Sequence, residues 1–163
     1  SLWSQLMGKA VTGPLKAEEL EPIPMAHTTW ADWKAKHENT LVLSTDTGYR
    51  RDYDRDPYAG YERKDRVMFP VSHKNDKYHM KETVVGIEID GKFKAYPFSE
   101  LEKTSGRIED KFNGQKIVVH YDDKHKTATV TDPQGNEIHS TILYWFAWVA
   151  FHPDTQVFQA PKS

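Results

Sequence analysis

The sequence contains no cysteine. A chain without cysteine can form no disulfide, and it offers neither a thiolate nucleophile nor a thiolate metal ligand. It also has no run of 18 or more apolar residues, which argues against a membrane-spanning helix. Its N-terminus lacks the charged-then-apolar pattern of a signal segment. We therefore expect a soluble protein without membrane insertion. The compartment stays open, and an extracytoplasmic location is compatible with the sequence.

An excess of charge of one sign is also lacking. The chain has 22 Lys and Arg against 24 Asp and Glu, a formal net charge of -2, and the two signs are interspersed. A nucleic-acid surface normally needs a concentrated basic face, so we expect no nucleic-acid partner. No nucleophile elbow, phosphate loop or zinc-binding helix motif is present. At 163 residues the chain is long enough for a core, and we expect one domain over 1–163.

Two tryptophan-rich segments of the chain resemble each other. WADWKAKHENTLVL at 30–43, the first Trp segment, and WFAWVAFHPDTQVF at 145–158, the second Trp segment, align at a constant offset. Identical residues stand at six aligned positions: Trp30/Trp145, Trp33/Trp148, Ala35/Ala150, His37/His152, Thr40/Thr155 and Val42/Val157. Such a distant similarity predicts an internal repeat, meaning two copies of one supersecondary unit.

Each Trp segment should form a short helix followed by a short strand. Thr29 precedes the first segment and Asp32 follows within one turn, which is the pattern of a helix N-cap. Trp33 and its equivalent Trp148 lie on an apolar helical face and are predicted to be core residues. The strands are predicted at 40–43 and 155–158. The histidines could be metal ligands, but a shared packing role explains the other identities as well.

The segment 44–61, STDTGYRRDYDRDPYAGY, is the most unusual part of the chain, and we call it the aromatic loop. It has almost no aliphatic residue, so it suits neither a buried strand nor an amphipathic helix, and a loop of this length is uncommon unless it is functional or disordered. A calcium loop is not expected, because Pro57 stands at the required glycine position and Arg63 at the required glutamate position. Either the aspartates and arginines pair as a lattice that orders the loop, or the loop forms the wall of a binding site. In the second case the loop faces the loop 73–82 and binds a small ligand or a cation, and the candidate ligand-binding residues are Asp52, Tyr53, Asp56, Tyr58 and Tyr61.

An enzyme is the alternative to a binding or interaction module. General acid-base catalysis would combine the aromatic loop with the loop 73–82, whose histidines His73 and His79 make only a weak metal signal. The candidate catalytic residues are Asp46, Asp52, His73 and Lys81. No metal site or cofactor is identified from the sequence.

From Thr83 onward the pattern is β. Asp90-Gly91 and Asn113-Gly114 each lie between strand-like runs and predict two-residue hairpin turns. A third hairpin is predicted around 132–135. The fold class is therefore α+β, mainly an antiparallel β meander of hairpins with two or three short helices.

Several stretches together resemble one known family. SLWSQLMGKAVTGPL, LVLSTDTGYRRDYDRDPYAGY, VVGIEIDGKFKAYPFSEL and AFHPDT are similar to the family named domain of unknown function 3179, found in bacteria and archaea. The resemblance covers nearly the whole chain and implies no activity. Family members are longer, with an upstream copy of the GIEIDGKFKAYPF unit and a Cys-Pro-Leu-Cys pattern. The chain thus resembles the C-terminal portion, and the resemblance implies an upstream half-domain as a partner, beside the small ligand that the loop suggests.

Overall fold

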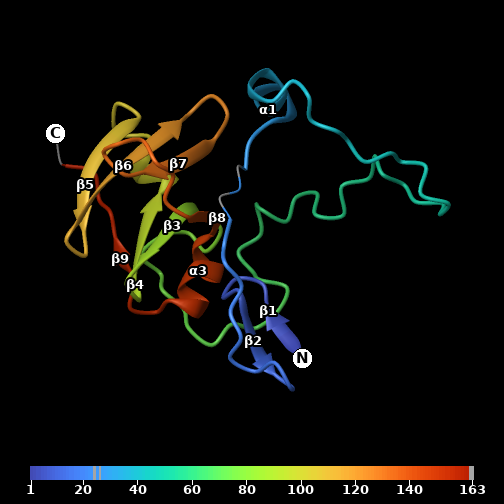
Figure 1. Ribbon diagram of the computed structural model, residues 1–163, viewed down its shortest axis with the longest axis horizontal. Helices are drawn as coiled ribbons and strands as arrows, with labels where there is room; N and C mark the ends of the chain where they lie inside the picture. The colour runs from blue at the N-terminus through green and yellow to red at the C-terminus, as the bar shows by residue number, and fades with distance from the viewer. Residues whose placement is uncertain (24, 26, 162–163) are drawn as a thin grey trace.

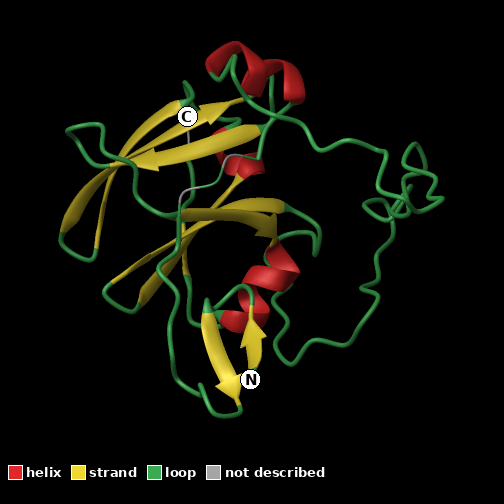
Figure 2. Cartoon of the chain, turned by 45° about the vertical axis from the view of Figure 1, so that its right-hand side comes forward, coloured by secondary structure: helices red, strands yellow, loops and turns green. Residues whose placement is uncertain are grey.

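The chain folds around two β-sheets that pack against each other, with a separate N-terminal hairpin (Figures 1 and 2). The computed structural model describes residues 1–23, 25 and 27–161. In the larger sheet the strand order is β8-β3-β4-β9, and in the second sheet it is β5-β6-β7. The elements before the larger sheet are β1 (Leu2–Ser4), β2 (Lys9–Thr12) and α1 (Trp30–Lys36). The remaining elements are β3 (Thr83–Ile89), β4 (Lys92–Pro97), α2 (Phe98–Leu101), β5 (Arg107–Phe112), β6 (Gln115–Asp122), β7 (Thr127–Thr131), β8 (Ser140–Tyr144), α3 (Trp145–Phe151) and β9 (Gln156–Val157).

Two of the predicted hairpins are confirmed. The β3–β4 turn has positive φ at Asp90 (50°) and Gly91 (70°), and the β5–β6 turn has positive φ at Asn113 (45°) and Gly114 (85°). Positive φ at both central residues is the conformation that matches the twist of the flanking strands. The α+β class with mainly antiparallel strands is confirmed as well. Among the described helices, none has the length and apolar character needed to cross a bilayer.

The third predicted hairpin forms only at its turn, where Thr131 bridges Glu137 and the Ile138 N–H donates to the Val130 carbonyl at 2.8 Å. Beyond this turn the prediction is wrong, because strand β8 pairs antiparallel with β3 in the other sheet. The reason lies in the alternating side chains of β8. Ile142 packs against the cluster between the sheets and Leu143 against the cluster beneath α3, so pairing with β3 buries apolar groups on both faces.

The core consists of two clusters on opposite faces of the larger sheet. The first fills the space between the sheets and includes Val85, Tyr96 and Val119. The second lies beneath α3 and includes Trp145 and Trp148. The sheets are also joined by a polar contact: the Lys94 ammonium and the Tyr96 hydroxyl donate to the same oxygen of Asp110, at 2.5 and 2.8 Å.

The two Trp segments differ in burial. In α3, Trp145 and Trp148 are 1% and 3% exposed, so the core prediction for Trp148 is confirmed. Helix α1 has no buried residue, Trp33 is only half-buried and Trp30 is 51% exposed, so the core prediction for Trp33 is wrong. Residues 40–43 form no strand, which corrects the expectation for the first segment, whereas β9 forms within 155–158. The physical reason is that β3 and β8 lie beneath α3, whereas no strand in the described part of the chain packs as extensively against α1.

Candidate functional site

The aromatic loop extends away from both sheets. In Figures 1 and 2 the chain after α1 runs out as a long excursion and returns toward the larger sheet, and every residue from 41 to 60 is exposed. The hydrogen bonds within the loop are local. The Tyr53 hydroxyl lies 2.9 Å from Thr47 Oγ1, and Asp52 and Asp56 accept bonds from backbone N–H groups two residues ahead. Such bonds shape turns and leave the tyrosine rings available for contact.

The predicted lattice of charged residues is absent. Among the described residues, no ion pair joins an aspartate of the loop to Arg50, Arg51 or Arg55. Ion pairs between exposed side chains contribute little to the free energy of folding, since the entropy cost of ordering two long side chains offsets most of the attraction. The charges of the loop therefore remain available to another molecule.

Lys81 anchors the end of the loop. Its side chain is buried, and its ammonium donates to the backbone carbonyl oxygens of Tyr61 and Lys64. The same nitrogen lies 3.8 Å from the centre of the Tyr61 ring, which adds a cation-π contact. Backbone oxygens and a ring face compensate the buried charge. The contacts also hold the returning chain against the start of β3.

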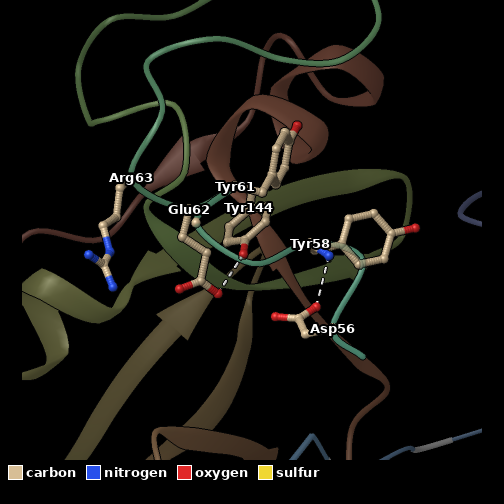
Figure 3. A pocket seen from close by; sticks show the side chains of 7 residues that line it. Asp56, Tyr58, Tyr61, Glu62, Arg63 and Tyr144 are labelled. Carbon is tan, nitrogen blue, oxygen red and sulfur yellow. Dashed lines mark hydrogen bonds between the residues drawn. The ribbon is translucent and has the colours of Figure 1, made fainter. Parts of the chain in front are cut away.

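A hollow of about 490 Å³ opens where the loop returns to the fold (Figure 3). We call it the tyrosine hollow. Tyr58 and Tyr61 meet edge to face with ring centres 6.4 Å apart, and the Tyr144 hydroxyl donates to Glu62 at 3.0 Å. Burial, followed by the neighbouring Glu62 carboxylate, raises the pKa of Tyr144 to about 12, so its hydroxyl keeps its proton. The hollow is lined by Asp56, Tyr58, Gly60, Tyr61, Glu62, Arg63 and Tyr144.

The structure brings together three of the predicted ligand-binding residues. Asp56, Tyr58 and Tyr61 line the hollow. Asp52 and Tyr53 lie outside its lining, earlier in the loop and farther in sequence from its anchored end. Sequence reasoning missed Tyr144, because it comes from the end of β8 and reaches the hollow only through the pairing of β8 with β3. It also missed Glu62 and Arg63, which directly follow the predicted segment. The sequence signal that could have identified them is their charge directly after the tyrosine-rich segment.

The predicted catalytic residues do not share a hydrogen-bond network. Asp46 and Asp52 make turn contacts inside the loop, and Lys81 is engaged with backbone carbonyls. In the described part of the chain, no hydrogen bond or ion pair links His73 to either aspartate, and His79 instead lies 2.7 Å from Asp65. General acid-base catalysis needs such groups within reach of one substrate atom. The assignment of these residues stays a prediction.

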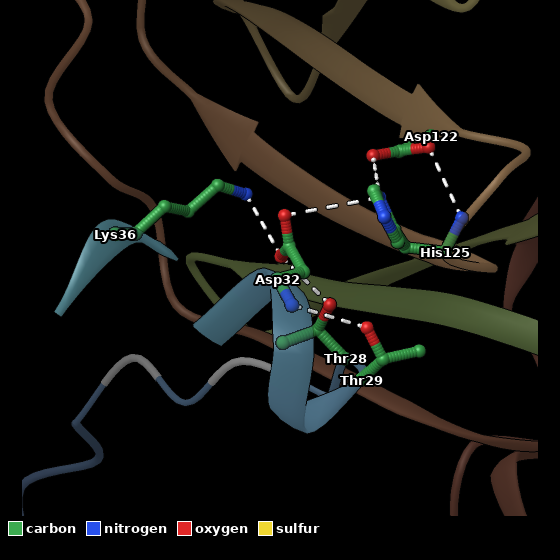
Figure 4. Close-up of polar contacts among 6 residues, drawn as sticks. All are labelled: Thr28, Thr29, Asp32, Lys36, Asp122 and His125. Atoms are coloured by element: carbon green, nitrogen blue, oxygen red, sulfur yellow. Dashed lines mark hydrogen bonds and ion pairs between the residues drawn. The ribbon is translucent and has the colours of Figure 1, made fainter. Parts of the chain in front are cut away.

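A second polar cluster connects α1 to the turn between β6 and β7 (Figure 4). His125 Nδ1 lies 2.6 Å from Asp122 and 3.8 Å from Asp32. Asp32 also accepts bonds from Thr28 at 2.8 Å and Lys36 at 2.9 Å, and its backbone N–H donates to the Thr29 hydroxyl, which confirms the predicted N-cap. The Lys36 bond, then the Thr28 bond, lower the pKa of Asp32, and the His125 bond lowers the pKa of Asp122.

This cluster offers the geometry of three ligand atoms. Asp32, Asp122 and His125 each have one potential ligand atom, a carboxylate oxygen or an imidazole nitrogen, and these three atoms lie within 4.8 Å of one another. Two carboxylates and an imidazole are ligands that several divalent cations accept. The three side chains already have partners, because His125 pairs with Asp122 and with Asp32 Oδ1, while Asp32 Oδ2 accepts from Lys36 and Thr28. These contacts are sufficient to tie α1 to the second sheet. We assign the cluster this positioning role.

The comparisons with known proteins point to one family. A family model described as protein of unknown function (DUF3179) matches residues 1–155. Searches of curated proteins and of solved structures found no match.

Proposed function

We propose that this chain, which belongs to the DUF3179 family of proteins of unknown function, is a binding module whose site is the tyrosine hollow. The ligand class is an extended peptide segment of a protein partner. The proposal depends chiefly on one observation: the aromatic loop is exposed from residue 44 to residue 60, yet Lys81 anchors its end at Tyr61, which lines the hollow together with Tyr58 and Tyr144. An exposed aromatic surface on a fixed base is typical of a recognition site.

The chemistry of the hollow suits a peptide. Tyrosine offers a large apolar body with a polar tip at low cost in side-chain entropy, and tyrosine and arginine are enriched where proteins meet. Tyr58 and Tyr61 present ring surface, while Asp56, Glu62 and Arg63 place charges of both signs at the same opening. Those charges can pair with side chains or backbone amides of a bound segment. A volume of about 490 Å³ accommodates one or two side chains rather than a folded domain.

Selection from a displayed library of random peptides tests the proposal. The whole chain is used as bait, and the dissociation constants of recovered peptides are measured by calorimetry. We expect Tyr58→Ala to weaken binding by about tenfold or more, the effect of losing about 1.4 kcal/mol of contact. Tyr49→Ala is the matched control, because Tyr49 is an exposed tyrosine of the same loop outside the lining of the hollow. It should leave the dissociation constant nearly unchanged.

Two results would contradict the proposal. One is a set of peptides whose binding survives both Tyr58→Ala and Asp56→Ala. The other is a small ligand in place of peptides: calorimetry against calcium, magnesium and simple saccharides would then show heat that Asp52→Ala or Tyr58→Ala abolishes, while no peptide is enriched.

A further inference from the structure

The two Trp segments adopt the same local structure. Trp33 Nε1 donates to Thr40 Oγ1 at 2.9 Å, and Trp148 Nε1 donates to Thr155 Oγ1 at 2.9 Å. Both helices end at a histidine of nearly equal backbone angles, φ -136° and ψ 70° at His37 against φ -129° and ψ 67° at His152. Each histidine ring lies beside the tryptophan four residues before it, with centres 4.0 and 4.3 Å apart. The local fold thus does not depend on the sheet beneath it.

The second Trp segment shows what this unit packs against. The Trp148 ring lies on Gly86 of β3, so closely that a Cβ added to the glycine would be 2.3 Å from the ring. His152 stacks on Phe93 of β4 at 3.8 Å. Beyond the helix, Val157 pairs in parallel with Ala95, and the N–H of Phe158 donates to the Ala95 carbonyl at 2.9 Å. The β3–β4 hairpin therefore contributes three features: Gly86 leaves room for the Trp148 ring, Phe93 stacks on His152, and the edge of β4 pairs with β9.

The first Trp segment carries the same groups without a hairpin. Trp30 and His37 are exposed, and the residues equivalent to β9 and its successor are exposed almost completely, with Leu41 at 94% and Leu43 at 96%. Val42 is 70% exposed, whereas its equivalent Val157 is partly buried and packs against the cluster beneath α3. Exposed aliphatic and aromatic groups in one contiguous segment mark a contact surface.

Helix α1 is nevertheless held in a defined place. Asp32 has a side chain only 10% exposed and connects α1 to His125 at the β6–β7 turn (Figure 4). The contacts involve the Asp32 side of the helix and engage neither Trp33 nor Val42. The unit is preorganised, which lowers the entropy cost of association.

We propose that the first Trp segment is a docking site for a β-hairpin of another domain, one with the surface that β3–β4 presents to α3. The hairpin carries glycine where Trp33 rests and an aromatic ring opposite His37. Its second strand has a free edge that pairs in parallel with residues 41–43, an example of β-augmentation. The inference concerns a different surface from the tyrosine hollow and does not depend on it.

A second copy of this chain does not fit as the occupant. Its own β3–β4 hairpin already has α3 on this face, and its two edges are paired with β8 and β9. Docking it would require removal of the buried Trp145 and Trp148. A hairpin that another domain leaves uncovered has no such cost.

The test attaches a second copy of the hairpin to the whole chain. A copy of residues 83–98 is joined ahead of Ser1 through a flexible Gly/Ser linker of about 20 residues, long enough to give an effective concentration in the millimolar range. We expect the backbone amides of 41–43 to become protected from hydrogen exchange by about tenfold or more. Trp30 fluorescence should shift to the blue, measured against a chain with the linker alone.

Matched variants distinguish docking from nonspecific contact. Gly86→Val in the attached hairpin only, and Val42→Glu in the first Trp segment, should each abolish the protection, whereas Tyr58→Ala should leave it intact. Absence of protection in the parent fusion would overturn the proposal, as would protection that persists in both the Gly86→Val and Val42→Glu variants. Sedimentation that shows the unmodified chain dimerising, with loss of the dimer in Val42→Glu, would identify a second copy as the occupant and refute the hairpin.

Discussion

Replacing Trp148 with alanine is the most direct test of how the larger sheet is stabilised. The side chain is 3% exposed, its ring covers Gly86, and its edge meets Phe93 with ring centres 6.2 Å apart. A tryptophan buries about 200 Å² of surface, and at roughly 25 cal/mol per Å² this amounts to about 5 kcal/mol. Large-to-small replacements of buried aromatic residues cost about 3–5 kcal/mol in measured series. We expect a loss in this range.

Such a loss is a large part of the stability of an ordinary domain, which is about 5–15 kcal/mol. For a chain of this length it lowers the melting temperature by roughly 10 °C. The assay is urea unfolding followed by far-ultraviolet circular dichroism, because the substitution itself removes a tryptophan fluorophore. The midpoint should fall while the slope of the transition stays the same.

Trp30→Ala is the matched control. Trp30 also belongs to one of the two Trp segments, but its side chain is 51% exposed and its helix has no buried residue. Its removal should change the free energy of unfolding by no more than about 0.5–1 kcal/mol. Equal losses in the two variants, or an unchanged midpoint for Trp148→Ala, would refute the assignment of the core to the second segment.

Two further predictions concern the same face of the sheet. Gly86→Ala places a methyl group 2.3 Å from the Trp148 ring, and the overpacking should destabilise the fold by about 1–3 kcal/mol in the same urea assay, so an unchanged midpoint would contradict this packing. His152 is half-buried beside Phe93, and burial lowers its pKa, so the unfolded chain binds the proton more readily than the folded one. The stability from neutral His152 should be complete above the ordinary histidine pKa of 6.5 and should decrease as the pH falls through it. Urea midpoints at pH 7.5 and 5.5 should therefore differ less in His152→Gln than in the parent chain, and an equal difference would contradict this reading.

Local signals explain why much of the fold could be predicted. Asp90-Gly91 and Asn113-Gly114 adopt positive φ in two-residue turns, and this preference acts over four residues whatever surrounds them. The Thr29 cap of α1 is local in the same way. The turn after β7 carried a similar signal at 132–135, yet β8 joined the other sheet, because burial of Ile142 and Leu143 outweighed the nearest possible pairing.

The candidate site was predictable only in part. The tyrosines and aspartates of the aromatic loop stood out by composition, and three of the predicted residues do line the hollow. The contribution of Tyr144 depends on a contact with Glu62 across 82 positions of sequence. The anchoring role of Lys81 is equally nonlocal. Its hydrogen-bond partners are the backbone oxygens of Tyr61 and Lys64, and a pattern of side chains in the sequence does not predict bonds to backbone atoms.

The sequence by itself determined the hairpin turns, the two Trp segments with their common local structure, and the loop that has too few aliphatic residues to enter a core. The tertiary structure decided which surface receives a Trp segment. The two units have equivalent internal hydrogen bonds, but burial of a tryptophan requires a glycine-bearing sheet to receive it, and β3–β4 lies beneath α3 and not beneath α1. The segments themselves suit this difference, because the buried Val149 of α3 stands where α1 has Lys34, but the identity of the receiving hairpin depends on strands far away in the sequence.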